Sequence, residues 1–313
     1  MGNYLDKVNL VLNEVNKVVI GKSEVIRQVM TSIIAGGHIL LEDTPGVGKT
    51  TIAVAFSKAM ELDVRRVQFT PDVMPTDVIG FNILNKDGNM EYKEGPVLCN
   101  LFLADEINRT SPKTQSALLE VMEEGKITID GMVKEVPQPF IVMATQNPTG
   151  SAGTQLLPES QLDRFMVKLS VGYPDVESEV VMLRGKMSAQ GVESVQQVIT
   201  REDLINIKNE VLNIFVNDAV LKYIADIAAA TRNNYYLKLG LSPRGTIALA
   251  AMSKATAYLS GREYVIPEDV RYVADSVMGH RVILNTKARV NNVTTDMVID
   301  DILKNIAAPN IYR

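Results

Sequence analysis

The feature that most constrains this chain is a short glycine-containing loop between an apolar run and a helical pattern. The apolar run ends at Leu41, and Gly46, Gly48, Lys49 and Thr50 follow it. The glycines let backbone N–H groups curve around anionic oxygens, and the helix N-terminus adds unpaired donors and the positive end of a dipole. The segment predicts a phosphate-binding loop, in which Lys49 reaches the β- and γ-phosphates and the Thr50 hydroxyl ligates Mg²⁺. The residues expected around the phosphates are Thr44, Pro45, Gly46, Val47, Gly48, Lys49, Thr50 and Thr51.

The loop departs from the common pattern at one position. The pattern G-x-x-x-x-G-K-[ST] begins with glycine, and this chain has Asp43 there. The alternative interpretation is a chance Gly-Lys-Thr on a surface loop. The strand-like run before the loop and the helical pattern after it weigh against that alternative, and a second motif weighs against it further.

The second motif is the acidic pair Asp105-Glu106, which ends another apolar run. Ligands of open α/β sheets lie at the carboxyl ends of the strands, so both acids are expected to face the phosphate loop. Asp105 would hold Mg²⁺ through water, and Glu106 would orient and polarise an attacking water. Taken alone, two solvated acids at a strand end would be the more ordinary explanation. The phosphate loop in the same domain favours the chemical one.

Three further polar residues occupy positions from which they could reach a bound phosphate. Asn147 ends the next buried strand and could hold the γ-phosphate and the water together. Arg164 precedes the last strand and could stabilise transition-state charge, in its own subunit or in a neighbouring one. Arg244 opens a later helix and could link a second domain to the same ligand. Their ordinary alternatives are an Asn-Pro turn, a surface ion pair with Asp163 or another acid, and a solvated first-turn arginine.

Strand-like and helix-like patterns divide the chain in two. Over residues 1–173, strand-length apolar runs alternate with helical patterns, which predicts a mostly parallel sheet in a three-layer αβα domain. From residue 174 only helical patterns follow, which predicts an all-helical domain over 174–313. Its expected helices are 176–187, 201–212, 218–230, 243–259, 267–278 and 295–305.

Local turn signals predict two β-hairpins in the first domain. Asp-Gly pairs at 87–88 and 130–131 lie between strand-like runs, which predicts hairpins over 81–93 and 126–136. The other local expectations are a loop over 71–77, a strand over 97–104 and a helix capped by Ser23.

Composition excludes several classes of function. The net charge is −5 and no lysine- or arginine-rich run occurs, which argues against duplex nucleic acid as the main partner. The one cysteine, Cys99, lies in an apolar run, so the composition fits a reducing compartment.

His38 and His280 are far apart in sequence, which argues against a catalytic zinc site. The first residues lack the features of a signal peptide and no apolar stretch is long enough to span a bilayer, so the expected location is cytoplasmic.

The motifs together resemble those of the AAA+ ATPases, and of the MoxR family in particular, over nearly the whole chain. The run Asp-Glu-Ile-Asn-Arg-Thr at 105–110 is highly specific. An acidic residue at the position of Asp43 also occurs in that family. The stretches that carry the resemblance are residues 19–21, 41–51, 72–80, 95–97, 104–115, 144–148, 157–159, 161–165 and 242–244.

The resemblance implies an αβα nucleotide-binding domain with a helical lid, assembled as a ring, expected to be a hexamer, with ATP and Mg²⁺ as its cofactors. The two hairpins resemble the helix-2 insert and the pre-sensor-1 hairpin of this clade. The implied residue roles are Walker A for Lys49 and Thr50, Walker B for Asp105 and Glu106, sensor 1 for Asn147, the arginine finger for Arg164, sensor 2 for Arg244, and the adenine pocket for Val19, Ile20 and Gly21.

The resemblance also implies a kind of activity. MoxR-like proteins act as chaperone-like ATPases, often with von Willebrand factor A-type partner proteins, and help client enzymes to mature. The expectation is therefore an ATP-hydrolysing machine that remodels protein partners. The alternatives are a nucleotide-gated scaffold with negligible turnover and a metal-chelatase-like motor subunit, while the charge disfavours a nucleic-acid motor.

Overall fold

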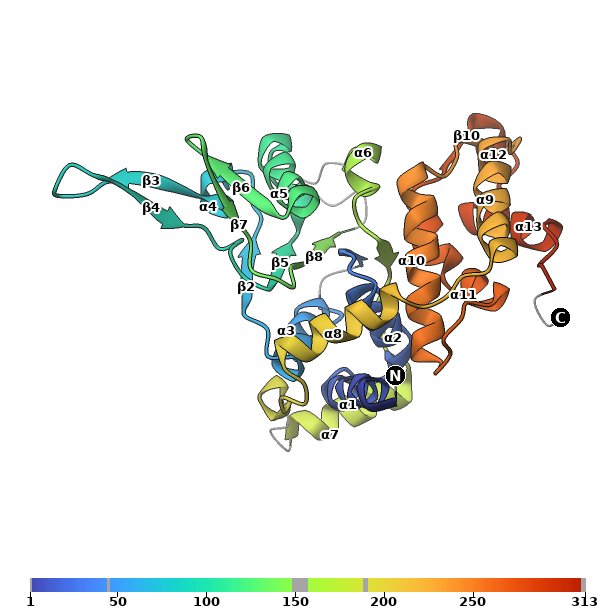
Figure 1. Ribbon diagram of the computed structural model, residues 1–313, viewed down its shortest axis with the longest axis horizontal. Helices are drawn as coiled ribbons and strands as arrows, with labels where there is room; N and C mark the ends of the chain where they lie inside the picture. Colours follow the sequence, from blue (N-terminus) through green and yellow to red (C-terminus); the bar gives the residue numbers. More distant parts are fainter. Residues whose placement is uncertain (1, 44–45, 148–156, 188–190, 311–313) are drawn as a thin grey trace.

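The computed structural model describes residues 2–43, 46–147, 157–187 and 191–310 (Figure 1). The strands of its central sheet are β1 (Ile39–Glu42), β2 (Val64–Gln68), β5 (Leu101–Asp105), β8 (Ile141–Gln146) and β9 (Val167–Leu169). All neighbouring pairs are parallel, in the order β2-β5-β8-β1-β9. Glu42 lies opposite Gln146, and Gln68 lies opposite Asp105. The carboxyl ends of these strands therefore meet at one edge of the sheet.

Helices cover both faces of this sheet. Those before residue 173 are α1 (Gly2–Val18), α2 (Ser23–Ile34), α3 (Lys49–Ala59), α4 (Pro75–Ile79), α5 (Pro112–Glu124) and α6 (Glu159–Leu162), with a 3-10 turn at Ile107–Arg109. Alternate strand residues point to opposite faces, so Leu40 and Phe102 pack with α5, while Leu41 and Leu103 pack with α1, α2 and α3. The predicted three-layer αβα arrangement is confirmed.

Both predicted hairpins are present. The first pairs β3 (Gly80–Leu84) with β4 (Met90–Glu94), and the second pairs β6 (Lys126–Ile129) with β7 (Met132–Glu135). Figure 1 shows β3 and β4 projecting away from the sheet. Asp130 and Gly131 have φ of 49° and 81°, the positive values that a two-residue hairpin turn requires. The Asn82 side-chain amide donates to Asp130 at 2.7 Å, so the two hairpins are joined.

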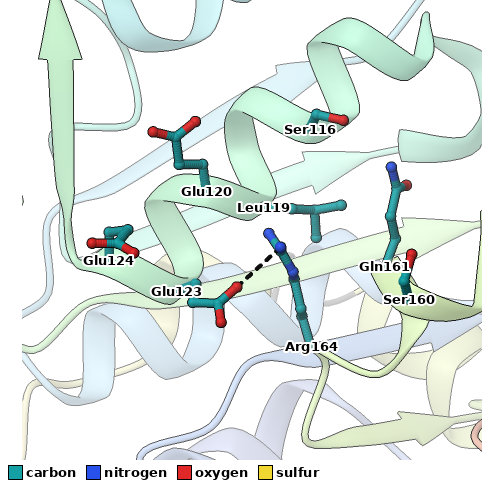
Figure 2. Close-up of a pocket in the computed structure, with 8 residues that line it drawn as sticks. All are labelled: Ser116, Leu119, Glu120, Glu123, Glu124, Ser160, Gln161 and Arg164. Atoms are coloured by element: carbon teal, nitrogen blue, oxygen red, sulfur yellow. Dashed lines mark ion pairs between the residues drawn. The ribbon is translucent and has the colours of Figure 1, made fainter.

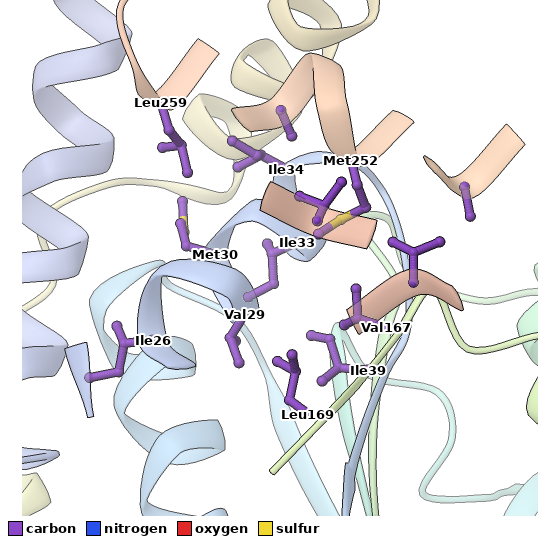
Figure 3. Packing of buried hydrophobic residues seen from close by; sticks show 14 of the residues in the cluster. Ile26, Val29, Met30, Ile33, Ile34, Ile39, Val167, Leu169, Met252 and Leu259 are labelled. Atoms are coloured by element: carbon purple, nitrogen blue, oxygen red, sulfur yellow. The ribbon is translucent and has the colours of Figure 1, made fainter. Parts of the chain in front are cut away.

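The rest of the chain is helical and packs against the first part. Its elements are α7 (Val176–Met187), α8 (Arg201–Leu212), α9 (Asp218–Arg232), α10 (Pro243–Leu259), α11 (Pro267–Met278), α12 (Thr286–Val290) and α13 (Thr295–Asn305), with a 3-10 turn at Val192–Ser194 and the short antiparallel strands β10 (Leu237–Leu239) and β11 (Ile283–Leu284). In Figure 3, Ile33 of α2 lies between Ile39 of the sheet and Met252 of α10. Because one buried cluster joins sheet, α2 and α10, the boundary at 173/174 stays a prediction.

The structure corrects several local predictions. The expected loop over 71–77 contains the start of α4 at Pro75, and the expected strand over 97–104 begins only at Leu101. Val97 is buried in a turn, with its N–H bonded to the Val78 carbonyl, because an apolar run does not distinguish a buried turn from a strand. Ser23 is the first residue of α2 and not its cap; its hydroxyl donates to Asn16.

The second domain departs from an all-helical one by its short strands β10 and β11. They pair through so few residues that alternation cannot reveal them in the sequence. None of the helices in the described ranges has the length and apolarity to cross a membrane.

Candidate functional site

The phosphate loop has the backbone shape that its glycines predict. Gly46 and Gly48 have φ of 91° and 96°, in the left-handed region that favours glycine. Among the described residues, no heavy atom lies within 4 Å of a Cβ atom built at either position, so the backbone conformation and not crowding favours glycine here. Gly48 is the N-cap residue of α3, and it has no side chain that could bind the first N–H groups of the helix. Such N–H groups can bind an anion. Thr44 and Pro45 lie outside the described residues.

Lys49 lies at the base of this loop. Its side chain is buried, and its Nζ donates to the backbone carbonyl oxygen of Asp43 at 2.6 Å. Burial lowers the pKa of Lys49, and the negative charges of Asp43, Asp105 and Glu106 oppose that shift. The ammonium therefore lies at the start of the loop, and the charges of the acidic pair are close enough to affect its pKa. Its contact with a phosphate stays a prediction.

Asp43, the residue that departs from the common pattern, anchors the start of the loop. Its backbone N–H donates to the Gln146 carbonyl oxygen at 3.2 Å. Its carboxylate accepts hydrogen bonds from the Ser170 hydroxyl at 2.8 Å and from the Gly172 N–H at 2.6 Å. Asp43 therefore connects the end of β1 to the segment after β9, a role that glycine could not supply.

Replacing Asp43 with Ala should destabilise the protein, because it removes the acceptor of both bonds. Hydrogen bonds to charged groups contribute more than neutral ones, so we expect a loss of about 1–3 kcal/mol in the free energy of unfolding. Denaturant titration measures it. Asp87→Ala, at an exposed hairpin turn, is the matched control and should change little. Equal stability of the two variants would contradict the anchoring role.

The acidic pair is held by the neighbouring strand. One Asp105 oxygen accepts from the Thr145 hydroxyl at 2.5 Å, and the other pairs with Arg66 at 2.6 Å. The N–H of Glu106 donates to the same Thr145 hydroxyl at 2.9 Å. Glu106 has φ of 56°, a left-handed conformation that is costly for a residue with a side chain. This conformation turns Glu106 off the line of β5, and such local strain is typical of functional positions.

The Glu106 carboxylate is held from three sides. One oxygen accepts from the Asn147 side-chain amide at 2.9 Å, and the other accepts from Arg109 at 2.7 Å and from the Gln68 amide at 3.0 Å. The Arg109 hydrogen bond, and secondarily that of Asn147, lowers the pKa of Glu106, so the group is ionised at neutral pH. The structure thus brings Asn147 into contact with Glu106, and adds Arg109 and Gln68, which the sequence did not reveal. The predicted roles of Glu106 and Asn147 toward water and phosphate stay predictions.

A cavity of about 750 Å³ lies beside the phosphate loop. Val19 and Ile20, which the resemblance assigns to the adenine pocket, line this cavity. Gly21 instead permits close packing, because a Cβ there would come within 2.2 Å of the Ser178 hydroxyl on α7. The described residues that line the cavity are Asn16 to Ile20, Lys22, Gly46 to Gly48, Thr51, Pro174, Val181, Met182 and Arg184. Apolar walls beside an anion-binding loop suit a molecule with a flat ring and a phosphate chain.

Arg164 and Arg244 both pair with Glu123, away from the cavity beside the phosphate loop. Arg164 lies 3.0 Å from one carboxylate oxygen of Glu123 (Figure 2). Arg244 pairs with the other oxygen of the same carboxylate. Arg164 also lines a separate cavity of about 350 Å³ along α5. Neither arginine is among the described residues that line the cavity beside the phosphate loop.

Comparison with known proteins places this geometry in a family. A model of the ATPase family associated with various cellular activities (AAA) matches residues 38–167, and a model of the AAA lid domain matches residues 229–302. Chaperone MoxR1 of Mycobacterium tuberculosis is 37% identical over 95% of this chain and 81% of its own length. This chain belongs to the MoxR family of AAA+ ATPases.

Two further proteins are similar to nearly the whole chain. The protein YeaC of Bacillus subtilis is 44% identical over 95% of this chain and 93% of its own. The crystal structure of a candidate ATPase from Cytophaga hutchinsonii superposes with a TM-score of 0.92 at 40% identity, covering 98% of this chain and 96% of that one. The MoxR-family fold, an αβα P-loop domain followed by a helical lid, is therefore confirmed, while the roles of individual residues stay predictions.

Proposed function

We propose that this MoxR-family protein binds ATP with Mg²⁺ and hydrolyses it to drive chaperone-like remodelling, maturation or activation of partner proteins. The observation that carries the proposal is the Glu106 carboxylate, which Asn147 and Arg109 hold at the sheet edge that also bears the phosphate loop. A related protein of the same family is named a chaperone, which supports a protein client.

Each residue of the site has a task that its position supports. Lys49 and the N–H groups of the loop would hold the β- and γ-phosphates. Glu106 would accept a hydrogen bond from the attacking water, and Asn147 would keep that carboxylate oriented. The Thr50 hydroxyl and the Asp105 carboxylate are the oxygen ligands that suit Mg²⁺, which when bound would neutralise charge on the phosphates.

The two arginines support assembly between copies. Because Arg164 and Arg244 lie together on Glu123 and away from the cavity of their own subunit, we propose that both act on the nucleotide of a neighbouring copy. Repetition of such a head-to-tail contact closes a ring, which we propose is a hexamer. A von Willebrand factor A-type protein and a client protein are the proposed partners, and the cytoplasm is the proposed location.

The test is ATPase activity per subunit as a function of protein concentration, with Mg²⁺ and saturating ATP. Activity should rise with concentration and then level off, in step with ring formation measured by size-exclusion chromatography. Constant activity from a protein that stays monomeric would refute completion of the site between copies. Absence of turnover from assembled protein would favour the nucleotide-gated scaffold.

A further inference from the structure

Arg281, a buried arginine of the lid, is hydrogen-bonded to residues 163–166, the segment that contains Arg164. Arg281 follows α11, and its side chain is only 2% exposed. Its Nε lies 2.8 Å from the carboxylate of Asp163, and its guanidinium donates to the carbonyl oxygens of Asp163 at 3.0 Å, Phe165 at 2.6 Å and Met166 at 3.0 Å. A buried charge persists only when its hydrogen bonds are satisfied, and here the 163–166 segment satisfies most of them.

Two other lid residues hold the same segment. The His280 ring donates from Nε2 to the Phe165 carbonyl oxygen at 3.0 Å, and the Ser242 hydroxyl donates to the Asp163 carboxylate at 2.8 Å. Ser242 also caps α10 by accepting from the Gly245 N–H at 2.9 Å. The start of α10 and the end of α11 therefore meet at Asp163.

These contacts lie next to both Arg164 and Arg244. Arg164 follows Asp163 directly and is flanked by backbone that Arg281 binds. Arg244 lies two residues after Ser242, and its guanidinium is 3.9 Å from the Asp163 carboxylate. We propose that Arg281 is a positioning residue that sets Arg164 and Arg244 as one unit for the nucleotide of a neighbouring copy. The inference rests on the proposed function, because it requires both arginines to act between subunits.

The fork shape of the guanidinium explains why an arginine is needed here. Its planar donors reach the carbonyl groups of Asp163, Phe165 and Met166 and a carboxylate together, which a lysine or glutamine cannot do. Loss of these bonds would let the 163–166 backbone shift, and a shift of about 1 Å in a group that contacts the transition state can cost roughly 100-fold in rate. The nucleotide cavity of the same subunit contains no part of this network among its described lining residues, so ATP binding should be retained.

The experiment mixes Arg281→Gln with Glu106→Gln protein. Alone, Arg281→Gln should lower kcat about 10- to 100-fold while the affinity for a fluorescent ATP analogue changes less than about two-fold. A 1:1 mixture should regain about a quarter of wild-type activity, because random head-to-tail assembly pairs an intact Glu106 with intact arginines at that fraction of interfaces. A purely structural defect in Arg281→Gln subunits would not be repaired by a neighbour.

Controls separate this proposal from the proposed function. Arg164→Ala mixed with Glu106→Gln tests action between subunits by itself. Arg262→Gln removes another lid arginine whose 2.5 Å ion pair with Asp269 stays within the lid, and it should keep wild-type kcat. Asp163→Asn, which keeps the size of the side chain, should reproduce the complementation if Arg281→Gln fails to fold.

The outcomes are distinct. Recovery in both mixtures supports the proposal. Recovery with Arg164→Ala but not with Arg281→Gln or Asp163→Asn overturns the positioning role and leaves the function intact. Recovery in neither mixture overturns the positioning role together with action between subunits, and wild-type kcat in Arg281→Gln overturns the positioning role alone.

Discussion

Replacing Glu106 with Gln should lower the turnover number for ATP by about 100- to 10,000-fold, the range that a positioned general base contributes. The amide is neutral and cannot polarise the attacking water as the carboxylate does. It also offers one acceptor oxygen where the carboxylate offers two, so a hydrogen bond from Asn147 or from Arg109 must be lost. ATP affinity should change little, because Lys49 and the loop remain.

Single-turnover hydrolysis and titration of a fluorescent ATP analogue measure the two quantities separately. Glu202→Gln, which alters an exposed carboxylate of α8, is the matched control and should behave as the wild type. Hydrolysis by Glu106→Gln at the wild-type rate would refute the assignment of Glu106 as the residue that activates water. Loss of binding in the same variant would point instead to a role in holding the nucleotide.

The principal residues of the site could be predicted because their positions depend on local patterns. Strand, glycine loop and helix follow one another along the chain, so Lys49 and Thr50 needed no knowledge of tertiary structure. Asp105 ends β5, and Glu106 and Asn147 directly follow β5 and β8 of one parallel sheet. Parallel strands end at one edge whatever their order. The 2.9 Å hydrogen bond from the Asn147 side-chain amide to the Glu106 carboxylate follows from that rule.

The residues that hold the site could not be predicted, because their contacts depend on strand order. Thr145 reaches Asp105 only because β8 lies beside β5, and Gln68 reaches Glu106 only because β2 lies on the other side. In the sequence, Thr145 is one residue of a buried strand and Gln68 is one polar residue near a strand end. Neither residue belongs to a sequence pattern that distinguishes it from its neighbours.

The lid residues that contact the 163–166 segment could not be predicted, because their partners lie far away in the sequence. Arg281 and Asp163 are separated by 118 residues, and a buried arginine has no sequence pattern that differs from a solvated one. The sequence alone indicates only that Arg164 could pair with Asp163 or another acid. Its observed partner is Glu123, which α5 brings to the same place.

Replacing Arg164 with Ala should reduce kcat by roughly 1,000-fold or more, the scale at which an arginine that contacts the transferred phosphoryl group acts. Its guanidinium would stabilise charge that develops on the γ-phosphate during hydrolysis. ATP binding should stay within about two-fold of wild type, because the described lining of the subunit's own cavity does not include Arg164.

Steady-state kinetics at a protein concentration where rings are complete measures this loss, and Arg289→Ala, at an exposed position of α12, is the control. If Arg164→Ala kept a kcat within a few-fold of wild type, Arg164 would not be the residue that stabilises the charge on the γ-phosphate.

The carboxylate of Glu123, which both arginines share, leads to a second prediction. Because Glu123 pairs with both arginines, removing Arg164 changes the surroundings of Arg244 as well. The losses from Arg164→Ala and Arg244→Ala should therefore not add, since residues that act as a unit show strong coupling.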